Sequence, residues 1–459
     1  MTTTQDTTFD ATSSMPLTAE RIQALRDTFD ADPTARIAQN AVTRTDVNEI
    51  ALDRSIVTGT DFSFSTKLDD WKVTNQKRSG RCWLFAALNL FRVGAMKKMN
   101  VADFEFSQNY MFFWDKFERA NYFLSQIIDT ADRPLDDRTV AFLLDSPIDD
   151  GGQWNMFMNL VRKHGVVPQA CMPETESSSN SGRMNSALRH KLREGAMQLR
   201  TLQDSGADMD RLEATRDATL QTIWRILCVH LGTPPTSFDW QWNDKDKEFH
   251  RDGEMTPLQF AERYIDVPMN DYVCIVHDPR ESSPYGRTFT VDRLGNVVGG
   301  RPVVYLNVEM DVLKSITQSV LEGGEPVWFG CDVGPHMERK AGLWDRELFR
   351  YDDVYGAPFV LDKAQRLEYH QSLMTHAMLF TGVDVVEGQP RRWRVENSWG
   401  GDSSGRKGYY TMNDNWFDEY MFEIAARKNE LPAELQAAFE QEPIVLPAWD
   451  PMGSLACPR

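Results

Sequence analysis

The sequence predicts an α+β protein, because its strongest helical and strand patterns occupy separate parts of the chain. Residues 83–99 form an apolar run that nearly encircles a helix, which is typical of a buried central helix. Residues 378–386 are apolar and rich in β-branched side chains, and after a turn sequence at 387–390 we expect residues 393–396 to return as the partner strand. A chain of 459 residues exceeds one ordinary core, so we expect more than one packing unit.

Weaker patterns predict elements outside these regions. Thr18 is suited to cap a helix with a packing role, since apolar residues follow it at helical spacing. An apolar stripe over residues 220–231 predicts another helix, which Gly232 ends. Residues 327–333 are expected to form a buried strand, whereas residues 174–185 are expected to form a serine-rich loop.

Composition and charge narrow the functional class. With 50 basic and 68 acidic residues the formal net charge is -18, and such a surface on average repels nucleic acid and anionic membranes. Residues 1–16 are expected to be disordered, and they lack the basic start and apolar core of a signal peptide. No apolar run is long enough to predict a transmembrane helix. The six cysteines are scattered without zinc-ligand spacing, so we expect reduced thiols in a cytosolic protein.

A cysteine at the start of the predicted central helix is the first candidate for chemistry. Cys82 directly precedes the apolar run at 83–99. The N–H groups of a helix N-terminus favour the thiolate, which is the form that attacks a carbonyl carbon. Gln76 lies shortly upstream and has a side-chain amide that can be directed at the same place. A buried cysteine is more often a small hydrophobe, so the interpretation depends on partners elsewhere in the chain.

A histidine and an asparagine far downstream complete a thiol-protease set. His376 opens the predicted strand and Asn397 follows the returning one. In such a hairpin the two residues lie near the same end of adjacent strands, so the asparagine can hold one imidazole nitrogen while the other faces a thiol. Each residue alone has an ordinary structural explanation. Gln, Cys, His and Asn in this order are hard to assemble by chance.

These motifs make the chain similar to the papain-like cysteine peptidases, and specifically to their bleomycin hydrolase and bacterial aminopeptidase C branch. The resemblance runs from about Phe62 to the C-terminus, and it is carried by Asn75-Gln76 and Ser79-Gly80-Arg81-Cys82-Trp83, Asp150-Gly151-Gly152-Gln153-Trp154, Trp328-Phe329-Gly330-Cys331-Asp332-Val333-Gly334, Leu373-Met374-Thr375-His376-Ala377-Met378, Asn397-Ser398-Trp399-Gly400 and Leu446-Pro447-Ala448-Trp449-Asp450-Pro451-Met452-Gly453. The generic papain signature has a further cysteine where this chain has Ser79, as expected for the cytosolic branch. The resemblance implies a two-lobed papain-like fold with large, partly helical insertions.

The spacing of the candidate residues predicts where the insertions lie. Cys82 and His376 are 294 positions apart, whereas papain relatives use roughly 130 to 150, so the surplus must be inserted subdomains. We expect five parts: an N-terminal extension with one helix (1–60), a helix-led catalytic lobe (61–168), inserted subdomains that build an assembly surface (169–325), a sheet-rich catalytic lobe (326–440) and a C-terminal arm (441–459).

The resemblance also implies roles for the candidate residues. Cys82 is expected to be the nucleophile, resting as an ion pair with His376, while Asn397 orients the imidazole. Trp399 is expected to shield that hydrogen bond from water, with a plain core aromatic as the alternative. Gln76 and the backbone N–H of Cys82 are expected to form the oxyanion hole.

Two further regions resemble substrate-binding elements. Gly151 and Gly152 look like the loop whose backbone pairs with an extended substrate, with a simple turn as the alternative. The C-terminal arm is expected to fold into the cleft and to offer its carboxylate to the free amine of a peptide. Ala456 matches the end of the family pattern, so Cys457-Pro458-Arg459 runs past it, and we expect the enzyme to remove these last residues itself.

The function that the resemblance implies is that of a cytosolic cysteine aminopeptidase acting on peptides without metal or cofactor. Amide hydrolysis of the bleomycin hydrolase kind is a further expected activity, and a homohexamer with active sites facing an internal cavity is the expected assembly, with no membrane partner. The alternative is a nucleic-acid-binding protein with incidental peptidase activity, since some relatives bind DNA, although the net charge of -18 opposes it. The complete set of candidate residues disfavours a third possibility, a catalytically silent scaffold.

Overall fold

The computed structural model describes residues 16–69, 71–401 and 405–456. Most of the segment expected to be disordered, and the last residues Cys457, Pro458 and Arg459, lie outside these ranges. The chain divides into two compact units: residues up to Ile56 together with Glu347–Val360, and Val57–Arg346 together with the chain from Leu361 onward. The division into five parts made from the sequence stays a prediction. None of the described helices is long and apolar enough to cross a bilayer.

The smaller unit consists of short helices. These are α1 (Ala19–Ala31), α2 (Pro33–Val42), α3 (Val47–Ala51) and α14 (Tyr351–Tyr355), and α4 (Arg54–Gly59) crosses into the larger unit. The predicted cap of α1 is confirmed, since the hydroxyl of Thr18 accepts a hydrogen bond from the N–H of Arg21 at 3.3 Å. No residue of α1 is buried, so the packing role expected of its apolar face is not seen within this chain.

The larger unit is organised around one mixed sheet of twelve strands among the described residues. Its order is β14-β5-β6-β4-β13-β7-β10-β11-β12-β9-β8, and β1 pairs with β10. The strands are β1 (Thr66–Lys67), β4 (Tyr272–Val276), β5 (Thr288–Val291), β6 (Tyr305–Asn307), β7 (Val327–Cys331), β8 (Met337–Glu338), β9 (Leu343–Trp344), β10 (His376–Val386), β11 (Gln389–Glu396), β12 (Tyr409–Asn413), β13 (Met421–Arg427) and β14 (Ile444–Leu446). The predicted hairpin is confirmed as β10 and β11, and the predicted buried strand is β7, which pairs with β10 on the other side.

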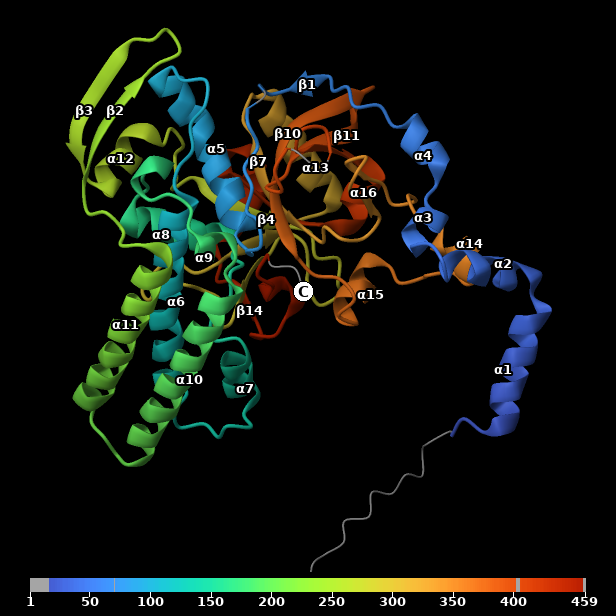
Figure 1. The fold of residues 1–459 in the computed structure, drawn as a ribbon, viewed down its shortest axis with the longest axis horizontal. Coiled ribbons are helices and arrows are strands. Elements are labelled where there is room, and N and C mark those ends of the chain that lie inside the picture. Colours follow the sequence, from blue (N-terminus) through green and yellow to red (C-terminus); the bar gives the residue numbers. More distant parts are fainter. Residues whose placement is uncertain (1–15, 70, 402–404, 457–459) are drawn as a thin grey trace, which may run out of the picture. The chain divides into compact units, whose positions relative to one another are not determined.

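The central helix is also confirmed. α5 (Cys82–Met99) begins at the cysteine and ends at Asn100, which adopts a left-handed conformation. Its residues are buried nearly all round because the sheet lies on one side, and α6 (Gln108–Asp129) and α8 (Trp154–His164) cover the other (Figure 1). Helices and strands thus occupy separate layers, as the α+β prediction requires. The described cysteines form no disulfide.

The inserted region contains two long helices. α10 (Gly182–Asp204) and α11 (Met209–Leu231) lie side by side and pack on α6 (Figure 1), and Gly232 ends α11 as predicted. The other elements of the larger unit are α7 (Arg138–Asp145), α9 (Glu176–Ser179), α12 (Pro257–Tyr264), α13 (Met310–Glu322), α15 (Lys363–Glu368), α16 (Asp414–Tyr420), α17 (Ala433–Gln436), the hairpin β2 (Phe238–Asn243) and β3 (Phe249–Met255), and four short 3₁₀ turns. The prediction of a loop at 174–185 is wrong, because Thr175 and Ser178 cap each other at the start of α9 and α10 begins at Gly182.

Four strands of the central sheet were not expected. β4, β5 and β6 come from the inserted region, and β14 comes from the C-terminal arm. β4 pairs with β13, while β14 pairs in parallel with β5. The insertion is therefore not only helical, and the arm is anchored in the sheet before it turns toward Cys82.

Candidate active site

Cys82 is the residue at which the helical layer meets the sheet. It opens α5 and is fully buried. The backbone N–H of Ala377, the second residue of β10, donates to its Sγ at 3.4 Å. The neighbouring Arg81 is fixed by two hydrogen bonds from its guanidinium to Glu174, at 2.8 and 2.6 Å. The candidate nucleophile is thus held against the start of the strand that carries the candidate base.

His376 and Asn397 lie together at one end of the hairpin, as the sequence predicts. Their Nε2 and Oδ1 atoms are 2.9 Å apart. The register of β10 and β11 pairs Leu379 with Glu396. His376 and Asn397 lie past this pair, at the same end of the hairpin. The other imidazole nitrogen, Nδ1, is buried and has no hydrogen-bond partner among the described residues. The next residue is Ala377, whose backbone N–H contacts the sulfur, so the backbone of His376 lies near Cys82.

Trp399 covers the imidazole. The centroids of the two rings are 5.0 Å apart, and the guanidinium of Arg339 lies 4.7 Å from the centroid of the indole. Trp399 is half-buried, whereas His376 and Asn397 are almost completely buried. This is the position that the expected shielding role requires.

Gln76 is held rigidly beside Asn397. Its Oε1 accepts a hydrogen bond from the hydroxyl of Ser398 at 2.6 Å, and its backbone N–H donates to the carbonyl of Ser398 at 2.9 Å. Its Nε2 donates to the carbonyl of Ser79 at 2.6 Å, which uses one of the two amide hydrogens. The amide is therefore oriented, with one N–H left to offer to an oxyanion.

The glycine loop is shaped by the side chain that follows the nucleophile. A Cβ atom at Gly152 would lie 2.5 Å from the indole of Trp83, so only glycine fits there. The indole N–H of Trp83 donates to the carbonyl of Asp150 at 2.7 Å, and the carbonyl of Gly151 accepts a hydrogen bond from Arg119. The loop is more than a simple turn, because its position is fixed from α5 and α6.

Asp150 is a residue whose contribution the sequence did not reveal. Its carboxylate forms an ion pair with Lys116 at 2.6 Å and accepts a hydrogen bond from the backbone N–H of Gly80 at 3.1 Å. Burial raises the pKa of Asp150, but Lys116 and the hydrogen bonds outweigh burial and hold the pKa well below its usual range. This carboxylate ties the glycine loop to the loop before Cys82. The acid directly before the two glycines was the available signal.

The C-terminal arm ends at the thiol. The thiol of Cys82 donates to the carbonyl of Ala456 at 3.1 Å, and Ala456 is fully buried. The hydroxyl of Ser454 donates to the carbonyl of Met374 at 2.8 Å, and the side-chain amide of Gln153 donates to the carbonyl of Ser454. The last described residue of the arm thus lies against the candidate nucleophile.

Burial by the arm changes the protonation expected at the site. Burial lowers the pKa of His376 to about 4, and the hydrogen bond with Asn397 opposes this shift only partly. Burial in the arm-filled site thus favours the neutral imidazole, because the water that stabilises the imidazolium is displaced. The expected ion pair of Cys82 and His376 stays a prediction.

One group of potential metal ligands occurs among the described residues, and it is elsewhere. Asp244, Glu248 and His250 lie on the β2–β3 hairpin, with ligand atoms within 4.8 Å of one another. The carboxylate of Asp244 already accepts hydrogen bonds from the backbone N–H of Asp246 and from the side chain of Asn100. These contacts explain the cluster as a turn that stabilises the hairpin.

Known proteins share this sequence and architecture. The model of the Peptidase C1-like family matches residues 16–453. Bleomycin hydrolase of Mus musculus is 46% identical over 450 residues, which cover 96% of this chain and 99% of that protein. Aminopeptidase C of Listeria innocua is 46% identical over 393 residues, which cover 86% and 88% respectively. The crystal structure of pepw from a Lactobacillus has a TM-score of 0.94 at 44% identity, and the match covers 97% of this chain and all of that one. The chain therefore belongs to the Peptidase C1-like family.

Proposed function

We propose that this protein is a cysteine aminopeptidase that releases N-terminal residues from peptides. The observation that carries the proposal is the carbonyl of Ala456, 3.1 Å from the sulfur of Cys82. The distance joins the sulfur to the carbonyl oxygen, so it supports a peptide backbone reaching the candidate nucleophile. The relatives named above, an aminopeptidase C and a bleomycin hydrolase, support the same reaction class.

The reaction follows from the positions of four side chains. His376 takes the proton of the Cys82 thiol, and the sulfur attacks the carbonyl carbon of the substrate. The oxyanion of the tetrahedral intermediate receives hydrogen bonds from the free N–H of the Gln76 amide and the backbone N–H of Cys82. His376 then protonates the leaving amine, and water hydrolyses the thioester in the second half of the reaction. Asn397 keeps the imidazole oriented through its 2.9 Å hydrogen bond.

The arm determines that the enzyme acts at the N-terminal end of a peptide. If the mature chain ends at Ala456, its carboxylate lies beside the thiol and can bind the free ammonium group of a peptide. The enzyme removes Cys457, Pro458 and Arg459 itself, because the bond after Ala456 is the one presented to Cys82. Gly151 and Gly152 bind the backbone of the substrate in this arrangement.

A comparison of free and blocked peptides tests this function. We expect release of N-terminal residues from a mixed peptide library and no release from its N-acetylated counterpart, because only the free amine can bind the arm's carboxylate. Cys82→Ala protein serves as the control and should release nothing. Equal hydrolysis of free and acetylated peptides would contradict aminopeptidase action while leaving a thiol peptidase in place.

The assembly and location are finer proposals. A homohexamer is supported by the apolar residues that α1 exposes, Ile22, Leu25 and Phe29, which are 39%, 61% and 42% exposed. Sedimentation velocity of wild-type and Leu25→Glu protein tests whether α1 takes part in the assembly. A cytoplasmic location and bleomycin-like amide hydrolysis remain part of the proposal. The nucleic-acid alternative receives no support from the relatives, whose names describe peptidases and hydrolases.

A further inference from the structure

The C-terminal arm carries a buried acidic residue whose partner belongs to the body of the enzyme. The guanidinium of Arg280 donates to both carboxylate oxygens of Asp450, at 2.9 and 3.1 Å. The same guanidinium donates to Asp278, at 2.9 Å from Nε and 2.8 Å from Nη2. The side chains of Asp278, Arg280 and Asp450 are only 4%, 8% and 8% exposed. Arg280 is therefore shared between one carboxylate of the body and one of the arm, and we call these three residues the arm clamp.

The body residues of the arm clamp are held in place by contacts that do not involve the arm. Asn307, at the end of β6, is fully buried. Its Oδ1 accepts a hydrogen bond from the N–H of Asp278 at 2.8 Å, and its Nδ2 donates to the carbonyls of Asp278 and Ser283 at 2.9 and 2.7 Å. Asp278 in turn orients Arg280 through two parallel hydrogen bonds, so the guanidinium faces the arm in one fixed direction.

The arm side of the clamp controls the turn that leads to the thiol. Oδ1 of Asp450 accepts a hydrogen bond from the N–H of Met452 at 2.9 Å, which caps the 3₁₀ turn Pro451–Gly453. The carbonyl of Asp450 accepts from the N–H of Gly453, also at 2.9 Å. A Cβ atom at Gly453 would lie 2.8 Å from Val291, so this turn is pressed against β5. The direction in which the chain leaves the turn toward Ala456 thus depends on how Asp450 is held.

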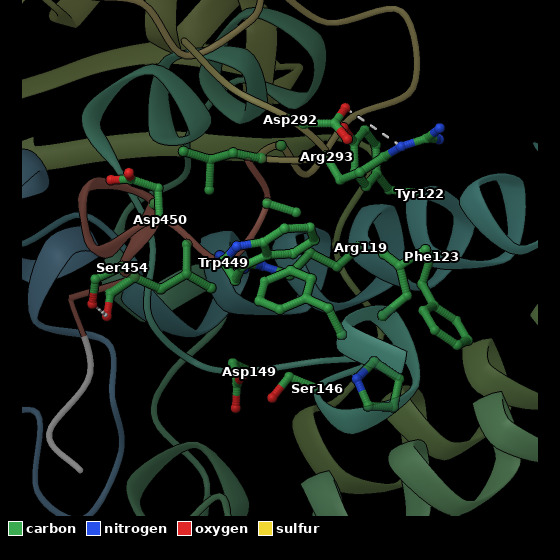
Figure 2. Close-up of a pocket in the computed structure, with 18 of the residues that line it drawn as sticks. Arg119, Tyr122, Phe123, Ser146, Asp149, Asp292, Arg293, Trp449, Asp450 and Ser454 are labelled. Carbon is green, nitrogen blue, oxygen red and sulfur yellow. Dashed lines mark hydrogen bonds and ion pairs between the residues drawn. The ribbon is translucent and has the colours of Figure 1, made fainter. Parts of the chain in front are cut away.

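One flank of the arm is open. A cavity of about 600 Å³ is lined by Trp449, Ser454 and Leu455 of the arm and by the body residues Arg119 and Phe142. In Figure 2 the indole of Trp449 points into this cavity, with Asp450 and Ser454 along one side of it. Packing therefore holds this part of the arm on the flank away from the cavity, and the arm has room to move into the cavity.

The remaining contacts of the arm are weaker than the clamp. The hydroxyl of Tyr305 donates to the carbonyl of Met452 at 3.2 Å, and Arg138 lies 3.9 Å over the ring of Trp449. Within the described part of the arm, Asp450 is the residue that forms an ion pair with the body. Hydrogen bonds between two charged groups are roughly twice as strong as those between neutral ones. The clamp is thus the ionic anchor of the described arm, beside the neutral hydrogen bonds that Ser454 forms with Gln153 and Met374 nearer the thiol.

We propose that Arg280 is a positioning residue for exopeptidase specificity. Held by Asp278, it grips Asp450 and fixes how far the arm reaches toward Cys82. This proposal rests on the proposed aminopeptidase function, because it concerns which substrates reach the thiol and not the bond-breaking step. Without the clamp the arm shifts into the neighbouring cavity, its end loses the amine-binding position, and peptides with blocked N-termini enter the cleft.

The test compares one peptide in free and N-acetylated form. We expect Arg280→Met and Asp450→Asn to lower the ratio of kcat/KM for the free peptide to kcat/KM for the acetylated one at least tenfold. The loss for the free peptide should lie in KM, because the amine-binding group is misplaced while the thiol is unchanged. Arg280→Lys keeps the charge but not the two-pronged geometry, so its ratio should be intermediate. Titration of active thiols with iodoacetamide normalises each variant.

Arg293→Met is the matched control. Arg293 lines the same cavity, and its ion pairs are with Asp129 and Asp292 rather than with the arm. This variant should keep the wild-type ratio. Asp450→Asn decides the outcome if Arg280→Met fails to fold, because it leaves Arg280 paired with Asp278.

The two proposals fail in different ways. If wild-type enzyme shows no preference for the free peptide, the aminopeptidase assignment is wrong, and so is the proposed role of the arm clamp. If wild-type enzyme shows the preference and both Arg280→Met and Asp450→Asn retain it, the aminopeptidase stands and the clamp is overturned.

Discussion

The catalytic hairpin and the C-terminal arm meet at the same sulfur atom but are held in opposite ways. β10 is paired with β7 on one side and with β11 on the other, and its residues are buried from His376 to Asp384. The arm is anchored by β14 and by Arg280, and one flank faces a cavity of about 600 Å³. The proposed proton-transfer group thus lies on a strand that is paired on both sides, while the group proposed to bind the substrate's amine lies on a segment with one open flank.

The largest expected effect comes from removing the sulfur. Cys82→Ala should lower peptide hydrolysis to background, because it removes the thiol at the start of α5, and burial raises the pKa of Cys331, the strand partner of His376, so that this thiol stays protonated. The same variant should keep all 459 residues, whereas active enzyme should lose those after Ala456. Intact mass spectrometry of both proteins checks this. Full-length protein with full aminopeptidase activity would show that the arm's end finds another path.

The hairpin side of the comparison can be tested at Gln76. Gln76→Ala should lower the acylation rate by about 10²- to 10³-fold with little change in substrate affinity, because the amide acts on charge that develops only in the transition state. Burst kinetics with a chromogenic substrate separate acylation from binding. An unchanged burst rate with a raised KM would instead make Gln76 a substrate-binding residue.

The arm side can be tested by shortening it. A chain that ends at Met452 should hydrolyse N-acetylated peptides internally and lose its preference for free N-termini, since the amine-binding carboxylate has been moved away. Product analysis by mass spectrometry identifies which bonds are cut. Strict removal of single N-terminal residues by the shortened enzyme would refute the role of the arm as the determinant of polarity.

The lowered pKa of the imidazole offers a test with a smaller effect. Burial lowers the pKa of His376 to about 4 while the arm fills the site. The chain that ends at Met452 readmits water, so the thiolate and imidazolium become more favourable, and alkylation of Cys82 at pH 6 should be faster than in the full-length chain. Peptide mapping after brief iodoacetamide treatment measures this rate. Equal rates would mean that the arm does not control the protonation of the pair.

The smallest expected effect lies where the sheet and the arm touch. Glu423 on β13 lines a small cavity together with Pro451 and Met452 of the arm. Burial raises the pKa of Glu423 to about 8, and the hydrogen bond with Cys274 opposes this. Between the unfolded pKa, about 4.3, and the folded one, the folded chain binds more protons than the unfolded chain, so this residue lowers stability as pH rises through that window.

Glu423→Gln should remove this dependence. We expect the melting temperature to rise by a few degrees at pH 8 and to be almost unchanged at about pH 3.5, because the carboxyl is largely protonated in both states at the lower pH. Scanning calorimetry at both pH values checks this, with the exposed Glu442→Gln as control. A gain of equal size at both pH values would assign the effect to packing.

The sequence predicted the parts of the molecule that have a strong local pattern. The helix after Cys82 and the hairpin from His376 were predictable, because each carries a long apolar run whose length or β-branched content indicates its type. The start of α10 was missed, because serine and threonine favour loops until their side chains cap a helix, as Thr175 does in α9.

Other features depend on partners far away in the chain and were not predictable. β6 and β14 have three residues each, which is too short to show a period. Arg280 and Asp450 are 170 positions apart; Arg280 has no local motif, and the motif that contains Asp450 does not indicate its partner. The lowered pKa of His376 also required knowledge of where Ala456 lies, since burial by the arm is what displaces the water.

The contact between Ala456 and Cys82 makes the chain end a tethered competitor for the substrate. A segment attached a few residues away acts at an effective concentration on the order of millimolar, whatever the enzyme concentration. Until the bond after Ala456 is cut, a peptide reaches the thiol only by displacing that segment, so the apparent KM of the uncut chain includes the occupancy of the site by its own arm. The uncut chain therefore favours peptides that are abundant or that bind the cleft more tightly than the arm does. Selectivity against scarce, weakly bound peptides then arises because the arm is covalently attached to the enzyme.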